Sequence, residues 1–179
     1  MEFQQSRTYS NLQNAYEIEL MMSSRDLIYS DRARQEGYIQ ISNIFEVISK
    51  NNREHARIWL RRLNEGILPS TSEFLQAAFQ EESYNGNELY REYARIAREE
   101  GFDEISSLFS GIANIDINHS QTFLSLYDDI ERSQVFCKPQ ETLWICMQCG
   151  NIMYGDCAPE ICPVCGFPQG FYMLYNPIV

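Results

Sequence analysis

The chain contains one segment twice, and this internal repeat constrains the fold more than any other feature. Residues 33–45 read ARQEGYIQISNIF, and residues 97–109 read AREEGFDEISSLF. In each copy a glycine, Gly37 or Gly101, separates two stretches in which apolar residues recur about every 3.6 positions, as they do in amphipathic helices. A glycine suits the left-handed residue that ends many helices. The repeat therefore predicts two helical hairpins, and two hairpins with a long connection between them predict a four-helix bundle.

The composition of the chain changes near residue 135. Before this point the sequence has few prolines, and Ser70–Glu73 has the form of a capping box that opens the third helix. After this point prolines and cysteines are concentrated. We predict a helical bundle over residues 1–135, a linker over residues 136–142 and a small cysteine-rich domain over residues 143–179.

Charge and hydropathy exclude two classes of partner. The formal net charge is −11, whereas a nucleic-acid-binding protein needs a basic surface. No apolar run approaches the roughly 20 residues that span a bilayer, and the polar N-terminus lacks the apolar core of a signal peptide. We therefore expect a cytoplasmic protein that binds neither nucleic acid nor membrane. In a reducing compartment, six cysteines favour metal or redox chemistry over a disulfide framework.

Polar residues occupy positions in the helical stripes where apolar core residues are expected. An unpaired carboxylate in a protein core costs several kcal/mol, so such residues are normally paired, protonated or bound to a metal ion. The repeat relates His55 to His119 and Asn52 to Asp116, and a one-residue insertion in the third helix would relate the glutamates as well. The in-phase polar residues are Glu19, Asp26, Asn52, His55, Glu82, Asn85, Asp116 and His119.

This pattern predicts a buried site for two metal ions. The first helix of each hairpin provides a glutamate, Glu19 or Glu82, and the second provides an Asn or Asp followed three residues later by a histidine. Facing helices build carboxylate–histidine di-metal sites from this arrangement, and imidazole with carboxylate suits iron, manganese or zinc. A hydrogen-bonded polar core without metal is the alternative. Asp26 lies at the edge of its stripe and faces either the site or solvent.

Four cysteines form a second candidate metal site. Cys146 and Cys149, followed by Cys162 and Cys165, repeat a spacing that is typical of one tetrahedral thiolate site. The glycine after each pair lets backbone N–H groups approach the sulfur atoms, and such bonds tune a bound metal. The spacing does not distinguish iron from a structural zinc ion. Cys157, between the two pairs, is predicted to be a packed thiol rather than a fifth ligand.

The chain as a whole resembles the rubrerythrins. The resemblance rests on LWICMQCG and GDCAPEICPVCG in the tail, and on AREEG and the histidine of NREH in the helical part. It implies a mainly α fold, in which a ferritin-like four-helix bundle is followed by a rubredoxin-like domain with four cysteine ligands. It also implies a non-haem iron oxidoreductase that reduces hydrogen peroxide at a di-iron site with electrons from an Fe(Cys)4 centre. The implied partners are a second copy in a head-to-tail homodimer and a redox protein that donates electrons.

The resemblance also assigns ligands, and it shows where this chain departs from the family. The family carries Glu-x-x-His on its second helices, whereas this chain has Asn52 and Asp116 in place of those glutamates. A further glutamate is replaced by Asn85 and a tyrosine of the site by Asp26, while Tyr90 matches a second tyrosine. The implied metal and catalytic residues of the helical site are Glu19, His55, Glu82, Asp116 and His119, and the implied tail ligands are Cys146, Cys149, Cys162 and Cys165.

The missing carboxylates predict weak binding of the second metal ion. Two divalent ions about 4 Å apart repel by roughly 17 kcal/mol at an effective dielectric constant of 20, and bridging carboxylates normally offset this repulsion. Three hypotheses remain: a peroxide reductase with a modified dinuclear site, an electron-transfer or iron-binding protein with one metal ion or none in the bundle, and a structural or regulatory module with a zinc-bound tail. Iron is the expected cofactor at both sites, with zinc as the alternative at either.

Overall fold

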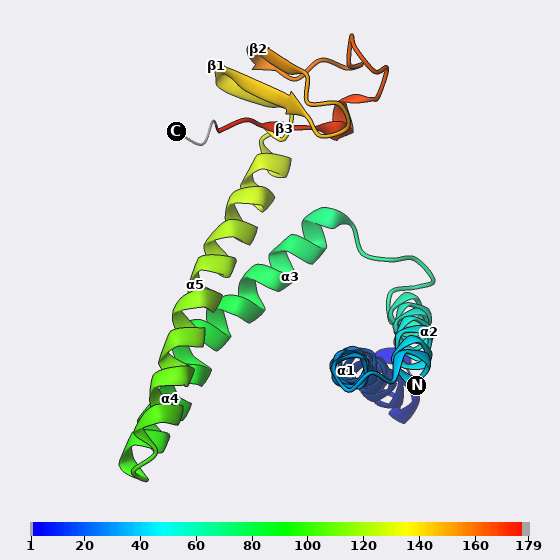
Figure 1. Cartoon of the computed structure of the whole chain (residues 1–179), viewed down its shortest axis with the longest axis vertical. Helices are drawn as coiled ribbons and strands as arrows, with labels where there is room; N and C mark the ends of the chain where they lie inside the picture. Colours follow the sequence, from blue (N-terminus) through cyan, green and yellow to red (C-terminus); the bar gives the residue numbers. More distant parts are fainter. Residues whose placement is uncertain (1, 177–179) are drawn as a thin grey trace. The chain divides into compact units, whose positions relative to one another are not determined.

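The computed structural model describes residues 2–176, in which helices precede a small strand-containing domain (Figure 1). Its elements are η1 (Phe3–Gln5), α1 (Arg7–Gln35), α2 (Ile39–Leu63), α3 (Thr71–Tyr84), the π-helical turn η2 (Asn85–Leu89), α4 (Tyr90–Glu99), α5 (Asp103–Glu131), β1 (Cys137–Cys146), β2 (Ile152–Cys157), η3 (Gln169–Phe171) and β3 (Tyr172–Leu174). None of the helices in this described part combines the length and the apolarity that crossing a bilayer needs.

Each of the two predicted helical hairpins is present. The chain divides into two compact units, which meet in the sequence between Pro69 and Ser70. In the first unit α1 packs along α2, and in the second α3, η2 and α4 form one continuous helix that packs along α5. The mainly helical fold class with a small C-terminal domain is therefore confirmed over the described residues.

The repeated segment forms the same corner in both hairpins. Gly37 and Gly101 adopt positive φ angles of 85° and 86°, which glycine reaches without a steric penalty. The residue after each glycine donates its N–H to the carbonyl five residues earlier, over 2.8 Å in both copies. This is the 6→1 hydrogen bond of a Schellman motif. The sequence repeat thus encodes two identical helix ends.

Small residues bring the paired helices close together. The Ser30 and Ser42 hydroxyls lie 2.9 Å apart between α1 and α2, and both residues are buried. At the equivalent positions of the second hairpin, the Ser106 hydroxyl donates to the Ala94 carbonyl over 2.7 Å. These contacts satisfy buried polar groups and fix how each hairpin is packed.

The predicted one-residue insertion is the π-helical turn η2. The Tyr90 N–H donates to the carbonyl of Asn85, five residues earlier, so this turn holds one residue more than an α-helical turn. The turn lies between Glu82 and the corner at Gly101. It therefore accounts for the extra residue that separates Glu82 from Asp116, compared with the spacing in the first hairpin.

Gly86 in this turn makes a close contact that predicts a measurable loss of stability on substitution. A Cβ atom there would lie 2.8 Å from both the Ala113 carbonyl oxygen and the Ile117 side chain of α5. We expect Gly86→Ala to lower the free energy of unfolding by about 1–3 kcal/mol, because overpacking strains the backbone.

Gly111→Ala in α5 is the matched control, because its Cβ would meet open space. It should raise stability by about 0.5–1 kcal/mol. Denaturant unfolding followed by helical circular dichroism compares them, and a gain for both variants would contradict the close contact.

The C-terminal domain is a small antiparallel sheet with strand order β2-β1-β3. Trp144 of β1 is fully buried, and its indole N–H donates to the Gly155 carbonyl over 3.2 Å. The hydrophobic core cluster of this domain contains two of the predicted metal ligands, so the candidate metal site is part of the core. The cluster comprises Trp144, Cys146, Ala158, Cys162 and Tyr172.

Residues 137–142 of the predicted linker lie in strand β1, while the linker and domain boundaries stay a prediction. One expectation for this region is wrong. Cys157, predicted to be a packed thiol, forms a disulfide bond with Cys137. The physical reason is strand register: the two residues are directly paired across β1 and β2, with 4.0 Å between their Cα atoms. Sequence spacing does not reveal such pairing.

Candidate metal centres

The four cysteines predicted to bind one metal ion converge in the C-terminal domain. Their sulfur atoms all lie within 4.8 Å of one another. The sulfurs of Cys146 and Cys165 are 3.7 Å apart, as are those of Cys149 and Cys162. A tetrahedral ion with metal–sulfur bonds of about 2.3 Å needs sulfur atoms about 3.8 Å apart. The four side chains therefore fit one tetrahedrally bound iron or zinc ion.

The cysteine centre is buried on one side and open on the other. Cys146 ends strand β1 and is buried, as is Cys162, whereas Cys149 is exposed. The buried sulfurs are held by the core around Trp144. The exposed side of the centre lies near solvent, which suits electron exchange with another protein.

Hydrogen bonds to sulfur favour the thiolate at Cys162, whereas burial and the neighbouring sulfurs oppose it at Cys165. The Tyr172 hydroxyl lowers the pKa of Cys162 to about 6, and the backbone N–H groups of Cys165 and Val164 act in the same direction. At Cys165 the Phe167 N–H also lowers the pKa, but burial and the three neighbouring sulfurs outweigh it and raise the pKa to about 12. Thiolates this close repel one another, so a bound cation is needed to keep all four ionised.

The first hairpin holds two pairs of the predicted helical site. Glu19 of α1 lies beside His55 of α2, with 3.4 Å between Glu19 Oε2 and His55 Nδ1. Asn52 lies one turn before His55 on α2, and its side-chain amide donates to Asp26 Oδ2 of α1 over 3.0 Å. Asn52 is 7% exposed and Asp26 is half-buried. Asp26 therefore turns toward α2 rather than toward solvent, and its carboxylate already has a partner.

The second hairpin holds a denser group of ligands. Glu82 lies in the last turn of α3, and Asp116 and His119 lie one turn apart on α5. One ligand atom from each of the three lies within 4.8 Å of the others, and 3.6 Å separates Glu82 Oε1 from His119 Nδ1. Asp116 is buried. Two carboxylates and one imidazole suit iron, manganese or zinc, so these residues fit a metal ion.

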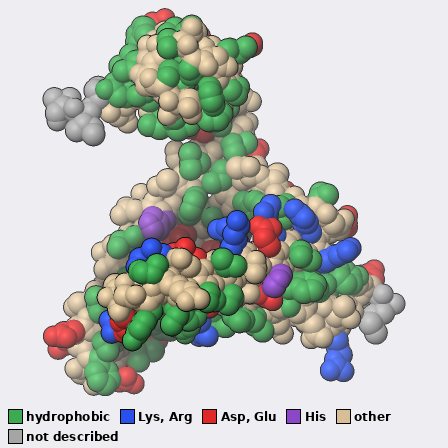
Figure 2. Space-filling view, turned by 45° about the vertical axis from the view of Figure 1, so that its right-hand side comes forward, with side chains coloured by type: hydrophobic (Ala, Val, Ile, Leu, Met, Phe, Trp, Pro, Cys, Tyr) green, Lys and Arg blue, Asp and Glu red, His purple; other side chains and the backbone are tan. Residues whose placement is uncertain are grey.

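The histidines of the two hairpins are partly open to solvent. Their side chains are 52% exposed at His55 and 53% exposed at His119, and Figure 2 shows histidine side chains (purple) at the surface. In the part of the chain that the structure describes, the second hairpin joins three metal-binding side chains, whereas Glu19 and His55 form a pair. The second hairpin is thus the stronger candidate for a bound ion.

Asn85 and Tyr90, also singled out in the sequence, lie on the same hairpin as the second group. Asn85, which replaces a family glutamate, is the first residue of the π-helical turn. Tyr90 begins α4 and stacks on Phe109 of α5, with 5.9 Å between ring centres. Neither was predicted as a ligand, and both stay on the hairpin that carries Glu82.

Two features of these centres were not predicted from the sequence. The hydroxyl of Tyr172 reaches Cys162, and only the pairing of Tyr172 with Cys146 across β3 and β1 places it there. The hydrogen bond between Asn52 and Asp26 was the second. Their spacing across the hairpin was visible in the sequence, but the direction of the Asp26 side chain was not.

Two family profiles match the chain. The profile described as rubrerythrin matches residues 10–69 and 73–147. The profile described as rubrerythrin, rubredoxin-like domain, matches residues 144–172. Together they cover the helical part and all four cysteines of the thiolate site.

Known relatives match over nearly their whole length. The chain is 34% identical to rubrerythrin-1 of Clostridium acetobutylicum, over 96% of this chain and 95% of that protein. It is also 34% identical to the rubrerythrin of Nitratidesulfovibrio vulgaris, over 94% of each. A solved structure described as a mixed-valence state of nigerythrin is 23% identical, and it covers 95% of this chain and 87% of that chain with a TM-score of 0.36.

Proposed function

The chain belongs to the rubrerythrin family of non-haem iron proteins, and we propose on this premise that it reduces hydrogen peroxide at a carboxylate–histidine iron centre. Family membership assigns a ferritin-like helical fold and iron as the cofactor of both sites. In the proposed reaction, hydrogen peroxide takes up two electrons and two protons and becomes two water molecules. The electrons arrive through the iron of the four-cysteine centre.

The grouping of Glu82, Asp116 and His119 is the observation that carries the proposal. Two carboxylates balance the charge of one Fe(II) ion, and the imidazole adds a neutral nitrogen ligand. Iron bound there supplies the one-electron chemistry that reduction of an O–O bond requires. The protein's contribution is to hold these side chains together, with Asp116 buried on α5 and Glu82 in the last turn of α3.

We propose Glu19 and His55 as ligands of a second, more weakly bound iron ion. The position that carries a bridging glutamate in the family is occupied by Asn52, which is neutral. Its amide already donates to Asp26, so the nearby carboxylate is held by a hydrogen bond rather than left free for a cation. With fewer free anions near Glu19 and His55, the first hairpin attracts a divalent ion less strongly.

An electron-transfer or iron-binding role is the second candidate. The hydrogen bond between Asn52 and Asp26 favours it, because a hairpin whose polar residues satisfy one another has less need of a metal ion. In that case the helical part would hold one iron ion, and the thiolate-bound iron would exchange electrons without peroxide turnover.

The partners in this proposal follow from the family. We propose a homodimer with a head-to-tail arrangement and a separate redox protein that donates electrons. The exposed side of the thiolate centre at Cys149 suits such a donor. A cytoplasmic location remains a prediction from the sequence.

A single-turnover reaction of reduced protein with hydrogen peroxide tests the function. Without air, the reduced protein is mixed with peroxide, and the returning visible absorption of the oxidised iron–thiolate centre is followed. We expect Glu82→Gln to slow this reoxidation at least tenfold, because the substitution removes one of the two carboxylates around the helical iron while the tail stays intact.

Glu81→Gln is the matched control for this reaction. Glu81 is the exposed neighbour of Glu82, so this variant should react as fast as the unmodified protein. Reoxidation of the Glu82 variant at the unmodified rate would show that peroxide is not reduced at the helical centre. The electron-transfer candidate would then be the better account.

A further inference from the structure

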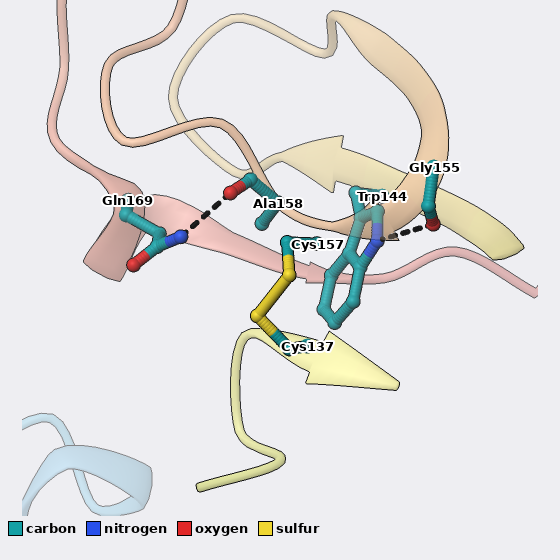
Figure 3. The surroundings of a disulfide bond; sticks show 6 residues. All are labelled: Cys137, Trp144, Gly155, Cys157, Ala158 and Gln169. Carbon is teal, nitrogen blue, oxygen red and sulfur yellow. Dashed lines mark hydrogen bonds between the residues drawn. A yellow bond between two sulfur atoms is a disulfide. The ribbon is translucent and has the colours of Figure 1, made fainter. Parts of the chain in front are cut away.

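We propose that Cys137 and Cys157 form a reversible thiol–disulfide site beside the four-cysteine metal centre. A dithiol reductant opens this disulfide bond, which is called the clasp below. The disulfide joins the first residue of β1 to the last residue of β2 (Figure 3). Neither cysteine belongs to the thiolate metal site, and the proposed peroxide reduction uses neither. The inference therefore stands apart from the proposed function.

The disulfide spans a part of the sheet where strand pairing is interrupted. Cys137 pairs with Cys157, and the next pair in the register is Thr142 with Gly155. Residues 138–141 of β1 consequently lie opposite one residue of β2. A bulge of this kind disrupts the hydrogen-bond ladder. The covalent bond thus holds the beginning of β1 where pairing alone is weak.

The residues next to the disulfide belong to the core that contains the metal ligands. Ala158 follows Cys157, is 3% exposed, and packs in one cluster with Cys146 and Cys162. Its N–H donates to the Phe136 carbonyl over 2.8 Å, beside Cys137. These contacts connect the disulfide to the segments that carry both ligands.

Two further contacts hold the segments next to the disulfide. The Gln169 side chain donates to the Ala158 carbonyl over 2.6 Å, as drawn in Figure 3. On the β1 side, Lys138 forms an ion pair with Asp129 of α5 at 2.7 Å. The disulfide lies between these two attachments, so opening it removes the covalent link at the base of the bulge of residues 138–141.

The disulfide is reachable from solvent. Cys157 is exposed, whereas Cys137 is half-buried. A reductant thiolate can therefore attack Cys157 Sγ, which forms a mixed disulfide and releases Cys137 as a thiolate. The second thiol of the reductant then attacks the mixed disulfide, so that its own disulfide forms and Cys157 leaves as a thiolate. Two electrons and two protons pass from the dithiol to the two cysteines, and an oxidised dithiol reverses the exchange.

Exposure of this kind marks labile disulfides rather than permanent ones. Closing a loop over a sequence separation of 20 residues lowers the equilibrium constant for opening by on the order of 100-fold. Reduction therefore makes the ligand-bearing segments open more often. Because metal release requires that opening, the redox state of the clasp sets how firmly the tail metal is retained.

The experiment compares the unmodified chain with a Cys137→Ser/Cys157→Ser double variant, each with and without dithiothreitol. The metal-loaded proteins are alkylated under native conditions with N-ethylmaleimide, and the labelled cysteines are located by peptide mass. In parallel, release of the tail metal to a chelator is timed. The double variant controls for binding of metal by dithiothreitol itself, because that effect is common to both chains.

The proposal expects three results together. The unmodified chain treated with oxidised dithiothreitol carries no label at Cys137 or Cys157, and both are labelled after reduction. Reduction speeds metal release at least tenfold in the unmodified chain. The double variant releases its metal at the fast rate, and dithiothreitol adds nothing. Labelling of both cysteines after oxidative treatment would overturn the thiol–disulfide site. Equal rates of metal release with and without the disulfide bond would overturn the claim that the clasp retains the tail metal.

Discussion

Replacing Asn52 by glutamate is expected to raise the affinity of the proposed Glu19–His55 site for Fe(II) about 100-fold. A negative charge about 4 Å from a divalent cation attracts it by roughly 8 kcal/mol at an effective dielectric constant of 20. Desolvation of the new carboxylate offsets most of this gain. A residual of about 2.7 kcal/mol corresponds to the expected 100-fold change. Anaerobic titration with Fe(II), followed by calorimetry or by metal analysis after gel filtration, measures the affinity.

The neighbouring residue provides a matched control for this substitution. Asn51 is exposed on the same helix, so Asn51→Glu adds the same charge away from the predicted centre and should leave iron affinity unchanged. In metal-free protein, Asn52→Glu should lower the free energy of unfolding, because the new carboxylate would face Asp26 in place of the present hydrogen bond. Equal iron affinity in both variants would show that the missing carboxylate does not limit the second site.

Replacing Cys162 by serine is expected to remove the tail metal and with it the path of electrons from an external donor. The rate of the proposed peroxide reduction should therefore fall at least 1000-fold. Cys162 is 2% exposed and packs in the same core cluster as Trp144. Because structural metal sites of this kind contribute on the order of 10 kcal/mol to folding, the C-terminal domain should also lose its fixed structure. Visible absorption, tail metal content and Trp144 fluorescence report these losses.

Cys157→Ser separates the loss of a ligand from the loss of a cysteine. Cys157 lies in the same domain but pairs with Cys137, so this variant should bind one tail metal ion at saturating iron, although it releases that ion faster. The helices should be unaffected by either substitution, and helical circular dichroism checks this. Full retention of tail iron by the Cys162 variant would contradict the assignment of that residue as a ligand.

The helical architecture could be predicted because its signals are local. Apolar periodicity and the glycines at Gly37 and Gly101 specify helix ends through contacts within a few residues. The extra residue in the second copy indicated an insertion, and the structure places it in the π-helical turn from Asn85 to Leu89. The grouping of the four cysteines could be predicted for the same reason, since each pair is fixed by its own short turn.

The features that escaped prediction depend on which strands and helices are neighbours. The disulfide between Cys137 and Cys157 requires the register of β1 against β2, and the bond from Tyr172 to Cys162 requires β3 to pair with β1. The orientation of Asp26 toward Asn52 likewise depends on side-chain geometry across a hairpin. Sequence spacing indicated which helical residues to consider as ligands, and the assignment of Glu19, His55, Glu82, Asp116 and His119 remains a proposal.

Iron analysis of protein purified without air tests the central claim most directly. The account predicts at least two iron ions per chain, one with iron–thiolate absorption in the tail and one in the helical part, and it predicts that Glu82→Gln lowers the count to the tail iron alone. One iron per chain that is unaffected by this substitution, or zinc in the tail without visible absorption, would contradict it.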